Sequence, residues 1–231
     1  MNLISNFLKR TLKKIYLNIL YRLPNKSYSQ EGEDLILKRF FENRKAGFYI
    51  DIGAFHPIRF SNTYLFYKMG WKGINIEARP GSKVLFDKNR KRDINIEAAI
   101  NDEVKELTYY KFNEPGLNGF SKEISMERNK LDEYKIIDEI KITTSTLTEA
   151  FKKHLPHEPK IDFMSIDVEG FDLNVLKSND WKNYRPEFVL VEDLNFDLMS
   201  PTKSDVFNYL IDKNYKLVAK SYNTLFFRDK V

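Results

Sequence analysis

Apolar residues follow two different periods along the chain from residue 27 onward. Short apolar runs, bounded by glycine or polar residues, predict buried strands at 47–55, 73–78, 94–100, 161–170 and 187–194. Segments with helical spacing separate most of these runs, and an alternating pattern at 215–229, with Asn223 near its turn, predicts a closing hairpin. This order predicts an α/β fold with a doubly wound, mostly parallel sheet and an antiparallel C-terminal strand.

The helices that this pattern predicts are short. Ser29 or Gln30 stands at the start of the first, and Ser61 is a candidate N-cap of the second. The predicted helical segments are 27–41, 61–69, 82–91, 172–178 and 200–214.

Residues 101–146 interrupt the alternation of strands and helices. The segment ELTYYKF alternates like a half-exposed strand, a glycine-containing loop follows, and residues 126–140 are rich in charge. A further strand and a helix then lead back into the regular pattern. We interpret 101–146 as an insertion beside the main sheet and as the place where substrate specificity resides.

The N-terminal residues 1–26 form a separate, basic amphipathic segment. Its apolar residues recur at helical spacing, and Pro24 and Asn25 end the pattern. Charges interrupt it too often for a transmembrane span, and it lacks the apolar core and cleavage site of a signal peptide. Three interpretations stay open: a helix packed on the body, a helix on an anionic membrane surface, or a helix that joins an oligomer or partner.

Composition and charge narrow the class of protein. The 231 residues include no cysteine, which excludes disulfides and Cys-ligated zinc and favours a reducing, cytoplasmic setting. Residues 1–30 hold six Lys or Arg and no acid, so removing these six from the formal charge of +5 leaves −1 for residues 31–231. A nearly neutral body argues against a nucleic-acid partner. We therefore expect residues 27–231 to form one soluble domain, with any membrane contact confined to residues 1–26.

Acidic residues follow four of the predicted central strands. They are Asp51, Glu77, the pair Asp167 and Glu169, and the pair Glu192 and Asp193. Burying an ionised carboxylate costs free energy, so acids that repeatedly end neighbouring strands indicate a ligand site at the carboxyl edge of the sheet.

The stretch GFYIDIGAFHP, residues 47–57, suggests which ligand binds there. An acid after the second strand of such a fold commonly binds the ribose hydroxyls of a nucleoside, and Glu77 has that position. A dinucleotide would need a glycine-rich phosphate loop, but Phe55 and His56 stand where further glycines would be. S-adenosylmethionine fits better, with Asp51 near its ammonium group and Gly53 allowing a close approach of the backbone.

Four motifs in series strengthen this interpretation. The segments YSQEGEDLIL, FYIDIGAFHP, GINIEARP and FMSIDVEGFDLNVL, in this order, resemble the FkbM family of S-adenosylmethionine-dependent methyltransferases. The resemblance covers about residues 27–229 and implies a Rossmann-like class I methyltransferase fold. It also implies O-methylation, often of a sugar hydroxyl.

The resemblance assigns roles to individual residues. It implies that Asp51 and Gly53 line the methionine end of the cofactor and that Glu77 holds the ribose. It further implies cofactor contacts from Gln30, Glu33, Ala54, Ala78, Ala99 and Ile100, the last two beside the adenine, and from Asp167. Arg79 departs from the family pattern, and we leave open whether it contacts an acceptor phosphate or only solvent.

Methyl transfer to a hydroxyl needs an aligned oxygen and a route for its proton. His56, Asp167 and Glu169 are the candidate general bases. Alternatively, Asp167, Glu192 and Asp193 offer the hard oxygen ligands that suit Mg²⁺ or Mn²⁺.

We expect the acceptor to be a nucleotide-activated sugar or a precursor of a surface glycan such as capsule or lipopolysaccharide. The expected location is the cytoplasm, with peripheral contact to the inner membrane through residues 1–26 and a homo-oligomer as a further option. Alternatives are a methyltransferase of another small molecule or of RNA, an NAD(P)-dependent oxidoreductase, and a non-catalytic nucleoside-binding module. The missing phosphate loop argues against the oxidoreductase.

Overall fold

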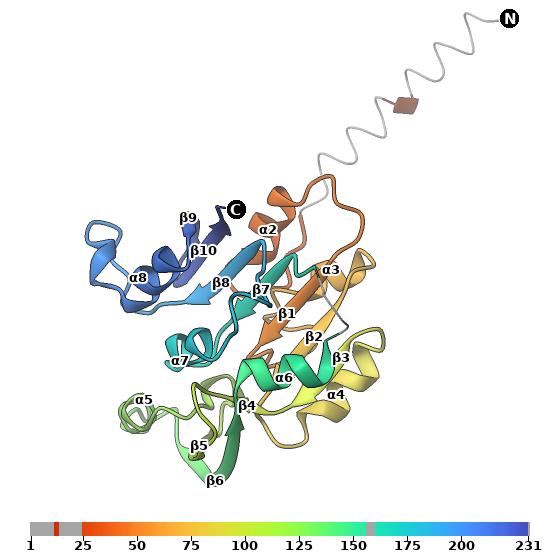
Figure 1. Cartoon of the computed structure of the whole chain (residues 1–231). Helices are drawn as coiled ribbons and strands as arrows, with labels where there is room; N and C mark the ends of the chain where they lie inside the picture. Colours follow the sequence, from red (N-terminus) through yellow and green to blue (C-terminus); the bar gives the residue numbers. More distant parts are fainter. Residues whose placement is uncertain (1–11, 14–24, 156–159, 231) are drawn as a thin grey trace, which may run out of the picture.

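A seven-stranded sheet forms the centre of the molecule. The computed structural model describes residues 12–13, 25–155 and 160–230. Its main sheet has the strand order β3-β2-β1-β7-β8-β10-β9 (Figure 1). The strands are β1 (Phe48–Ile52), β2 (Lys72–Glu77), β3 (Ile94–Glu97), β7 (Phe163–Ile166), β8 (Phe188–Glu192), β9 (Tyr215–Ser221) and β10 (Thr224–Asp229).

Strand direction agrees with the sequence pattern. β3, β2, β1, β7 and β8 pair in parallel, whereas β10 lies antiparallel between β8 and β9. β9 and β10 form the expected hairpin. The predicted doubly wound, mostly parallel sheet with an antiparallel C-terminal strand is therefore confirmed.

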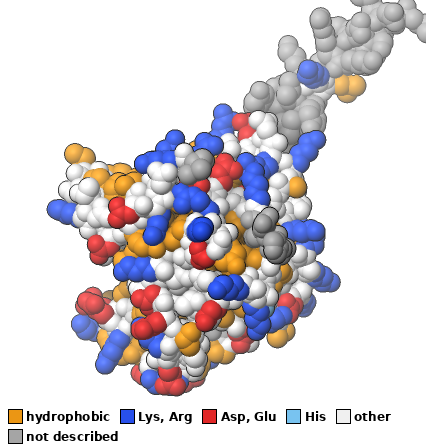
Figure 2. Space-filling model, in the orientation of Figure 1, with side chains coloured by type: hydrophobic (Ala, Val, Ile, Leu, Met, Phe, Trp, Pro, Cys, Tyr) orange, Lys and Arg blue, Asp and Glu red, His pale blue; other side chains and the backbone are white. Residues whose placement is uncertain are grey.

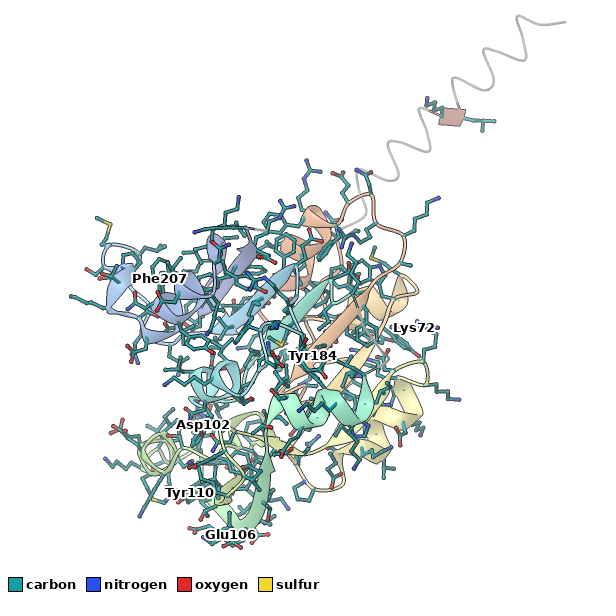
Figure 3. All side chains as sticks on the ribbon, viewed as in Figure 1. Lys72, Asp102, Glu106, Tyr110, Tyr184 and Phe207 are labelled. Carbon is teal, nitrogen blue, oxygen red and sulfur yellow. The ribbon has the colours of Figure 1, made fainter. Side chains whose placement is uncertain are left out.

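Helices cover both faces of this sheet. They are α2 (Glu33–Phe40), α3 (Tyr64–Lys68), α4 (Ser82–Asn89), α6 (Leu147–His154), α7 (Asp172–Lys177) and α8 (Asp205–Asp212). Side chains of α6, α7 and α8 pack on one face and those of α2 and α3 on the other. Figure 1 shows where these helices lie relative to the sheet. Alternation along β1 explains the division, because Ile50 and Ile52 point to the first face and Tyr49 to the second. Tyr184 and Phe207 in Figure 3 belong to the first face.

The first helix starts later than the sequence predicts. It begins at Glu33, after Gly32 in a left-handed conformation with φ 82°. The hydroxyl of Ser27 and the backbone N–H of Tyr28 both donate to the carboxylate of Asp34, which is fully buried. Residues 27–31 therefore form a loop around Asp34, which competes with a helical conformation.

The predicted strand 94–100 is divided between two sheets. β3 ends at Glu97, and β4 (Ala99–Ile100) pairs with Thr144 and Ser145 at the end of β6 (Ile136–Ser145). β6 also pairs with β5 (Glu106–Phe112), which completes a three-stranded sheet in the order β4-β6-β5. The chain leaves the main sheet at Ala98, whose N–H still bonds to the carbonyl of Glu77.

The inserted segment is therefore a small second sheet. The short helix η1 (Pro115–Leu117) and the helix α5 (Lys122–Arg128) join β5 to β6. Figure 3 shows Glu106 and Tyr110 of this sheet at one end of the molecule, away from Lys72 at the start of β2. The sheet thus lies beyond the carboxyl ends of the main strands, where a substrate-binding element is expected.

Most of the predicted N-terminal helix lies outside the described residues. Within the residues that the structure describes, no helix has the length and apolar character needed to cross a membrane. On the face shown in Figure 2, Lys and Arg side chains are interspersed with Asp and Glu side chains. This mixture agrees with the nearly neutral charge of the body.

The strand order changes direction between β1 and β7, and Gly53 lies at that point. The N–H of Gly53 bonds to the carbonyl of Ile76, and the N–H of Asp167 bonds to the carbonyl of Ile52. A Cβ on Gly53 would lie 1.7 Å from the carbonyl oxygen of Asp167. Gly53 also has φ 74°, a region that side chains disfavour. Only glycine fits this position.

We expect Gly53→Ala to lower the free energy of unfolding by more than about 3 kcal/mol, because the methyl group must push β1 and β7 apart. Gly81→Ala is the matched control: Gly81 has φ 81° but no atom within 4 Å of the added Cβ. It should cost only about 1–2 kcal/mol for the left-handed backbone. Urea denaturation, monitored by circular dichroism, measures the free energy of unfolding of both variants. Equal costs for the two variants would contradict the close approach.

Candidate functional site

A cavity of about 600 Å³ opens at the carboxyl ends of β1, β2, β7 and β8. The small second sheet and the turn between β9 and β10 contribute further walls. Its size is in the range of sites for small molecules and cofactors, and its place is the switch point where doubly wound folds bind ligands.

Most of the predicted site residues line this cavity. Those that do are Gln30, Glu33, Gly53, Glu77, Ala78, Ile100, Asp167, Glu169 and Glu192. Those that are not among its lining residues are Asp51, Ala54, His56, Ala99 and Asp193. The structure therefore brings nine of these residues to one cavity and leaves five outside its lining.

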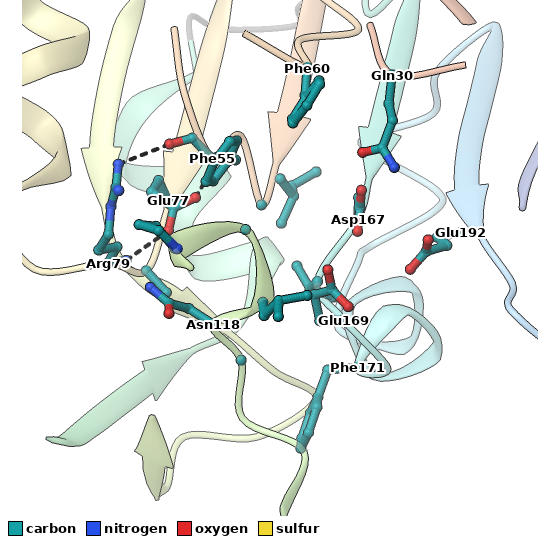
Figure 4. A pocket seen from close by; sticks show the side chains of 18 of the residues that line it. Gln30, Phe55, Phe60, Glu77, Arg79, Asn118, Asp167, Glu169, Phe171 and Glu192 are labelled. Carbon is teal, nitrogen blue, oxygen red and sulfur yellow. Dashed lines mark hydrogen bonds between the residues drawn. The ribbon is translucent and has the colours of Figure 1, made fainter. Parts of the chain in front are cut away.

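Glu77 ends β2 and holds the turn that follows β1. Its two carboxylate oxygens accept hydrogen bonds from the backbone N–H groups of Phe55 at 2.7 Å and Arg79 at 2.8 Å (Figure 4). Burial raises the pKa of Glu77, although the two backbone N–H groups oppose that rise. The guanidinium of Arg79 donates to the carbonyl of Phe55, so Glu77, Phe55 and Arg79 are each bonded to the other two. Glu77 is thus fixed in place at the cavity wall.

Asp51 points away from the cavity. It shares a face of β1 with Tyr49, and its carboxylate accepts a 2.6 Å hydrogen bond from Thr63 at the start of α3. Only 6% of Asp51 is exposed. Burial raises the pKa of Asp51 to about 6, whereas the Thr63 hydrogen bond and the charge of Arg90 lower it. The structure therefore places Asp51 beneath the site, as a support for the loop that precedes α3.

Arg90 lies beneath the site with Asp51 and Thr63, and its side chain is fully inaccessible to solvent. It donates to the carbonyl of Pro57 and to the hydroxyls of Ser61 and Thr63, at 2.7–2.9 Å. These three contacts fix residues 57–63, which carry the cavity-lining side chains Arg59, Phe60 and Asn62. Sequence patterns did not single out Arg90, because an arginine at the end of a short helix is ordinarily exposed.

His56 also supports this loop. Its Nδ1 accepts hydrogen bonds from the backbone N–H groups of Ile58 at 3.1 Å and Arg59 at 3.0 Å. Burial, followed by the charges of Arg59 and Arg79, lowers the pKa of His56. The neutral ring uses its acceptor nitrogen on the backbone, so the structure gives His56 a positioning role instead of the expected role as base.

Three acids gather on the side of the cavity opposite Glu77 and Phe55. Figure 4 shows Asp167, Glu169 and Glu192 close to one another, with the amide of Gln30 pointing toward Asp167. Glu169 pairs with Arg128 of α5 at 2.7 Å, which ties the second sheet to the loop after β7. Glu169 also has φ 54°, a strained backbone conformation for a residue with a side chain.

Strain of this kind is concentrated around the cavity. Phe55, Phe60, Glu169 and Tyr222 all have positive φ values and all line it. Phe55 and Phe60 stack with an interplanar angle of 18°, and Arg59 lies 4.7 Å from the ring centroid of Phe60. Sequence reasoning noted Phe55 only as an obstacle to phosphate. The structure shows it as part of an aromatic wall.

Asp193 is directed away from the three acids. Its carboxylate accepts a 2.5 Å hydrogen bond from Ser204, the N-cap of α8, and another from the N–H of Asn195. Among the described residues, no group of three or more His, Cys, Asp or Glu side chains is arranged to hold a metal ion. The predicted set of Asp167, Glu192 and Asp193 is thus not brought together.

Of the remaining residues predicted to contact the cofactor, some line the cavity and others do not. Ile100 lines the cavity, but its neighbour Ala99 is buried. Ala54 is also buried, and its N–H bonds to the carbonyl of Ile76. Contributions from the insertion were predicted only in general terms. Tyr109, Glu114, Asn118, Phe120 and Arg128 are among the side chains that supply them, together with the backbone of Gly119.

The sheet order, the acid fixed at the end of β2 and the cavity at the switch point define a Rossmann-like fold of the class I methyltransferase type. The sequence matches the methyltransferase FkbM domain over residues 51–217, and the chain belongs to this methyltransferase family. The match begins at Asp51, so the SQEGED segment, for which we also noted a resemblance, precedes it. A search of curated proteins gives no match.

The buried position of Asp51 predicts a pH-dependent effect on stability. Its pKa is higher in the folded protein than in the unfolded chain, so wild-type protein loses stability as pH rises from about 4 to about 6. Asp51→Asn removes this loss, and its stability relative to wild type should rise by about 2–3 kcal/mol between pH 4 and pH 7. Urea denaturation at several pH values measures the difference.

Thr63→Val provides the comparison, because it removes the hydrogen bond that lowers the pKa of Asp51. In this variant the loss of stability should extend to higher pH. A stability difference between Asp51→Asn and wild type that stays constant with pH would contradict the account.

Proposed function

We propose that the protein is an S-adenosylmethionine-dependent O-methyltransferase that acts on a carbohydrate hydroxyl. The observation that carries this proposal is the placement of Glu77, which is fixed by two backbone N–H groups at the wall of the switch-point cavity. The chain belongs to a family of methyltransferases, and this membership indicates that the reaction is a methyl transfer.

The cavity fits a nucleoside that carries no phosphate. Glu77 presents a carboxylate that accepts from ribose hydroxyls, as an acid at the end of the second strand does in related folds. The turn after β1 offers no free nest for phosphate, because the N–H of Phe55 is used by Glu77 and that of His56 by the carbonyl of Ala54. Ala78 and Ile100 add small and apolar surface on the same wall.

The acidic side of the cavity suits the charged end of such a cofactor. S-adenosylmethionine, when bound, supplies an electrophilic methyl group on a sulfonium. Gln30, Glu33 and Asp167 line the cavity together with Glu192 and Glu169, so carboxylates surround the space available for positive charge. A buried oxygen of Glu192, Oε2, has no hydrogen-bond partner among the described residues, which leaves a position for a donor group.

The residues around the acids suit a polyhydroxylated acceptor. Carboxylates accept hydrogen bonds from sugar hydroxyls, and aromatic rings pack against the apolar faces of sugar rings. Phe60 is 48% exposed and Tyr222 is 70% exposed, although both line the cavity. Arg59, on the cavity wall beside Phe60, offers a cation to a phosphate group. These features favour a nucleotide-activated sugar or a glycan precursor as the acceptor.

The role of Glu77 predicts the outcome of a binding experiment. Calorimetric titration of S-adenosylhomocysteine should give binding by wild-type protein that weakens about 10- to 100-fold in Glu77→Ala, because a charged hydrogen-bond acceptor for the ribose is lost. Thermal unfolding must show that the variant stays folded at the titration temperature.

Glu97→Ala is the matched control for this experiment. Glu97 ends β3 in register with Glu77 but does not line the cavity. This variant should bind S-adenosylhomocysteine within about twofold of wild type. Equal affinities of Glu77→Ala and wild type would place the nucleoside elsewhere, and absence of binding by wild type would overturn the proposed function.

A further inference from the structure

Asp167 and Glu192 lie side by side at the ends of two neighbouring strands. β7 and β8 run parallel with Ile166 opposite Val191, so the next residue of each strand is Asp167 and Glu192. Both line the cavity, and Figure 4 shows their carboxyl groups directed into the same part of it. Because side chains alternate along a strand, the following Asp193 points away and bonds to Ser204.

Other acids around this pair already have hydrogen-bond donors. Glu169 is paired with Arg128, and Glu33 accepts from the N–H of Glu31 and the hydroxyl of Thr224. The side chain of Glu192 has a hydrogen bond with Asn223, but its buried oxygen Oε2 has no partner among the described residues. A buried carboxylate oxygen without a donor is costly, unless the group is protonated or a ligand supplies the donor.

The charged groups facing the pair are mostly acids. They are Glu33 of α2, Glu169 after β7, Asp172 of α7 and one cation, Arg128 of α5, which is already engaged by Glu169. Asp51 points away from the cavity, but its charge also acts on Asp167. Burial, followed by the neighbouring charge of Glu192, raises the pKa of Asp167 well above its usual range. Burial, followed by Glu169, raises the pKa of Glu192 to about 8. Two adjacent carboxyls in such a place do not both ionise near neutral pH.

We propose that Asp167 and Glu192 hold one proton between them while the cavity is empty, release it when a positive charge enters, and leave Glu192 free to take the proton of the acceptor hydroxyl. This inference rests on the proposed function. It makes Glu192 a catalytic residue, alongside Asp167, and it makes the base available only when the methyl donor is present.

With Glu192 as the base, the bonds, the electron pair and the proton are all accounted for in the methyl-transfer step. The hydroxyl oxygen of the acceptor forms a bond to the methyl carbon as the carbon–sulfur bond breaks, and sulfur keeps that electron pair as a neutral thioether. The hydroxyl proton passes to the carboxylate of Glu192. After the step, the pair holds one proton again and the positive charge has gone, which restores the state of the empty cavity.

Proton release on ligand binding tests this proposal without an acceptor. S-adenosylmethionine is titrated into wild-type protein and Glu192→Gln at pH 7, in buffers that differ in ionisation enthalpy. Because the pKa of Glu192 is about 8, wild type should release most of one proton per site, and Glu192→Gln much less. Ionisation of the ligand's own amino group is common to both proteins and cancels in the difference.

Three comparisons make the result specific. S-adenosylhomocysteine, which lacks the sulfonium charge, should release less from wild type than S-adenosylmethionine does. Asp167→Asn should likewise release much less than wild type, and it serves as the second variant if Glu192→Gln does not fold. Glu114→Gln is the matched control, because Glu114 lines the same cavity but pairs with Arg59, and its release should equal that of wild type.

Equal proton release by wild type, Glu192→Gln and Asp167→Asn would overturn the inference while leaving the cofactor site intact. Absence of binding by either ligand to wild type would instead overturn the proposed function. The two failures are therefore distinguishable in one set of titrations.

Discussion

The contact between Gly53 and the carbonyl oxygen of Asp167 is the constraint on which the site depends. A side chain at Gly53 would separate β1 from β7 at the point where the strand order reverses. Because the two backbones meet there, the strand ends that carry Glu77, Asp167 and Glu192 converge on one cavity. Gly53 is thus needed for the close approach of β1 and β7, in addition to any close approach of a ligand.

Around this contact the cavity is divided into two regions of different chemistry. On one side, Glu77, Phe55 and Arg79 hold one another through backbone hydrogen bonds and present a fixed acceptor for hydroxyl groups. On the other, Asp167 and Glu192 lie among further acids, where positive charge is favoured. The ion pair of Arg128 with Glu169 connects the second sheet to this acidic side. A methyl donor with a nucleoside end and a cationic end matches this division.

Sequence patterns predicted the sheet and its antiparallel closing strand, and most of the predicted site residues line the cavity, because the carboxyl ends of parallel strands share one edge. They failed where the direction of a single side chain mattered. Asp51 lies one residue before the end of β1 and faces α3, and Asp193 lies one residue past Glu192 and binds Ser204. The break of the third strand at Ala98 depends on pairing with β6, some 45 residues away, which local patterns do not report.

A crystal structure of the protein with S-adenosylhomocysteine tests the central claim most directly. We expect the ribose hydroxyls within hydrogen-bonding distance of Glu77, the adenine beside Ile100, and the amino-acid end and thioether on the side of Asp167 and Glu192. Density for the ligand at any other place, or an adenosine that leaves Glu77 bonded only to the backbone of Phe55 and Arg79, would contradict the account.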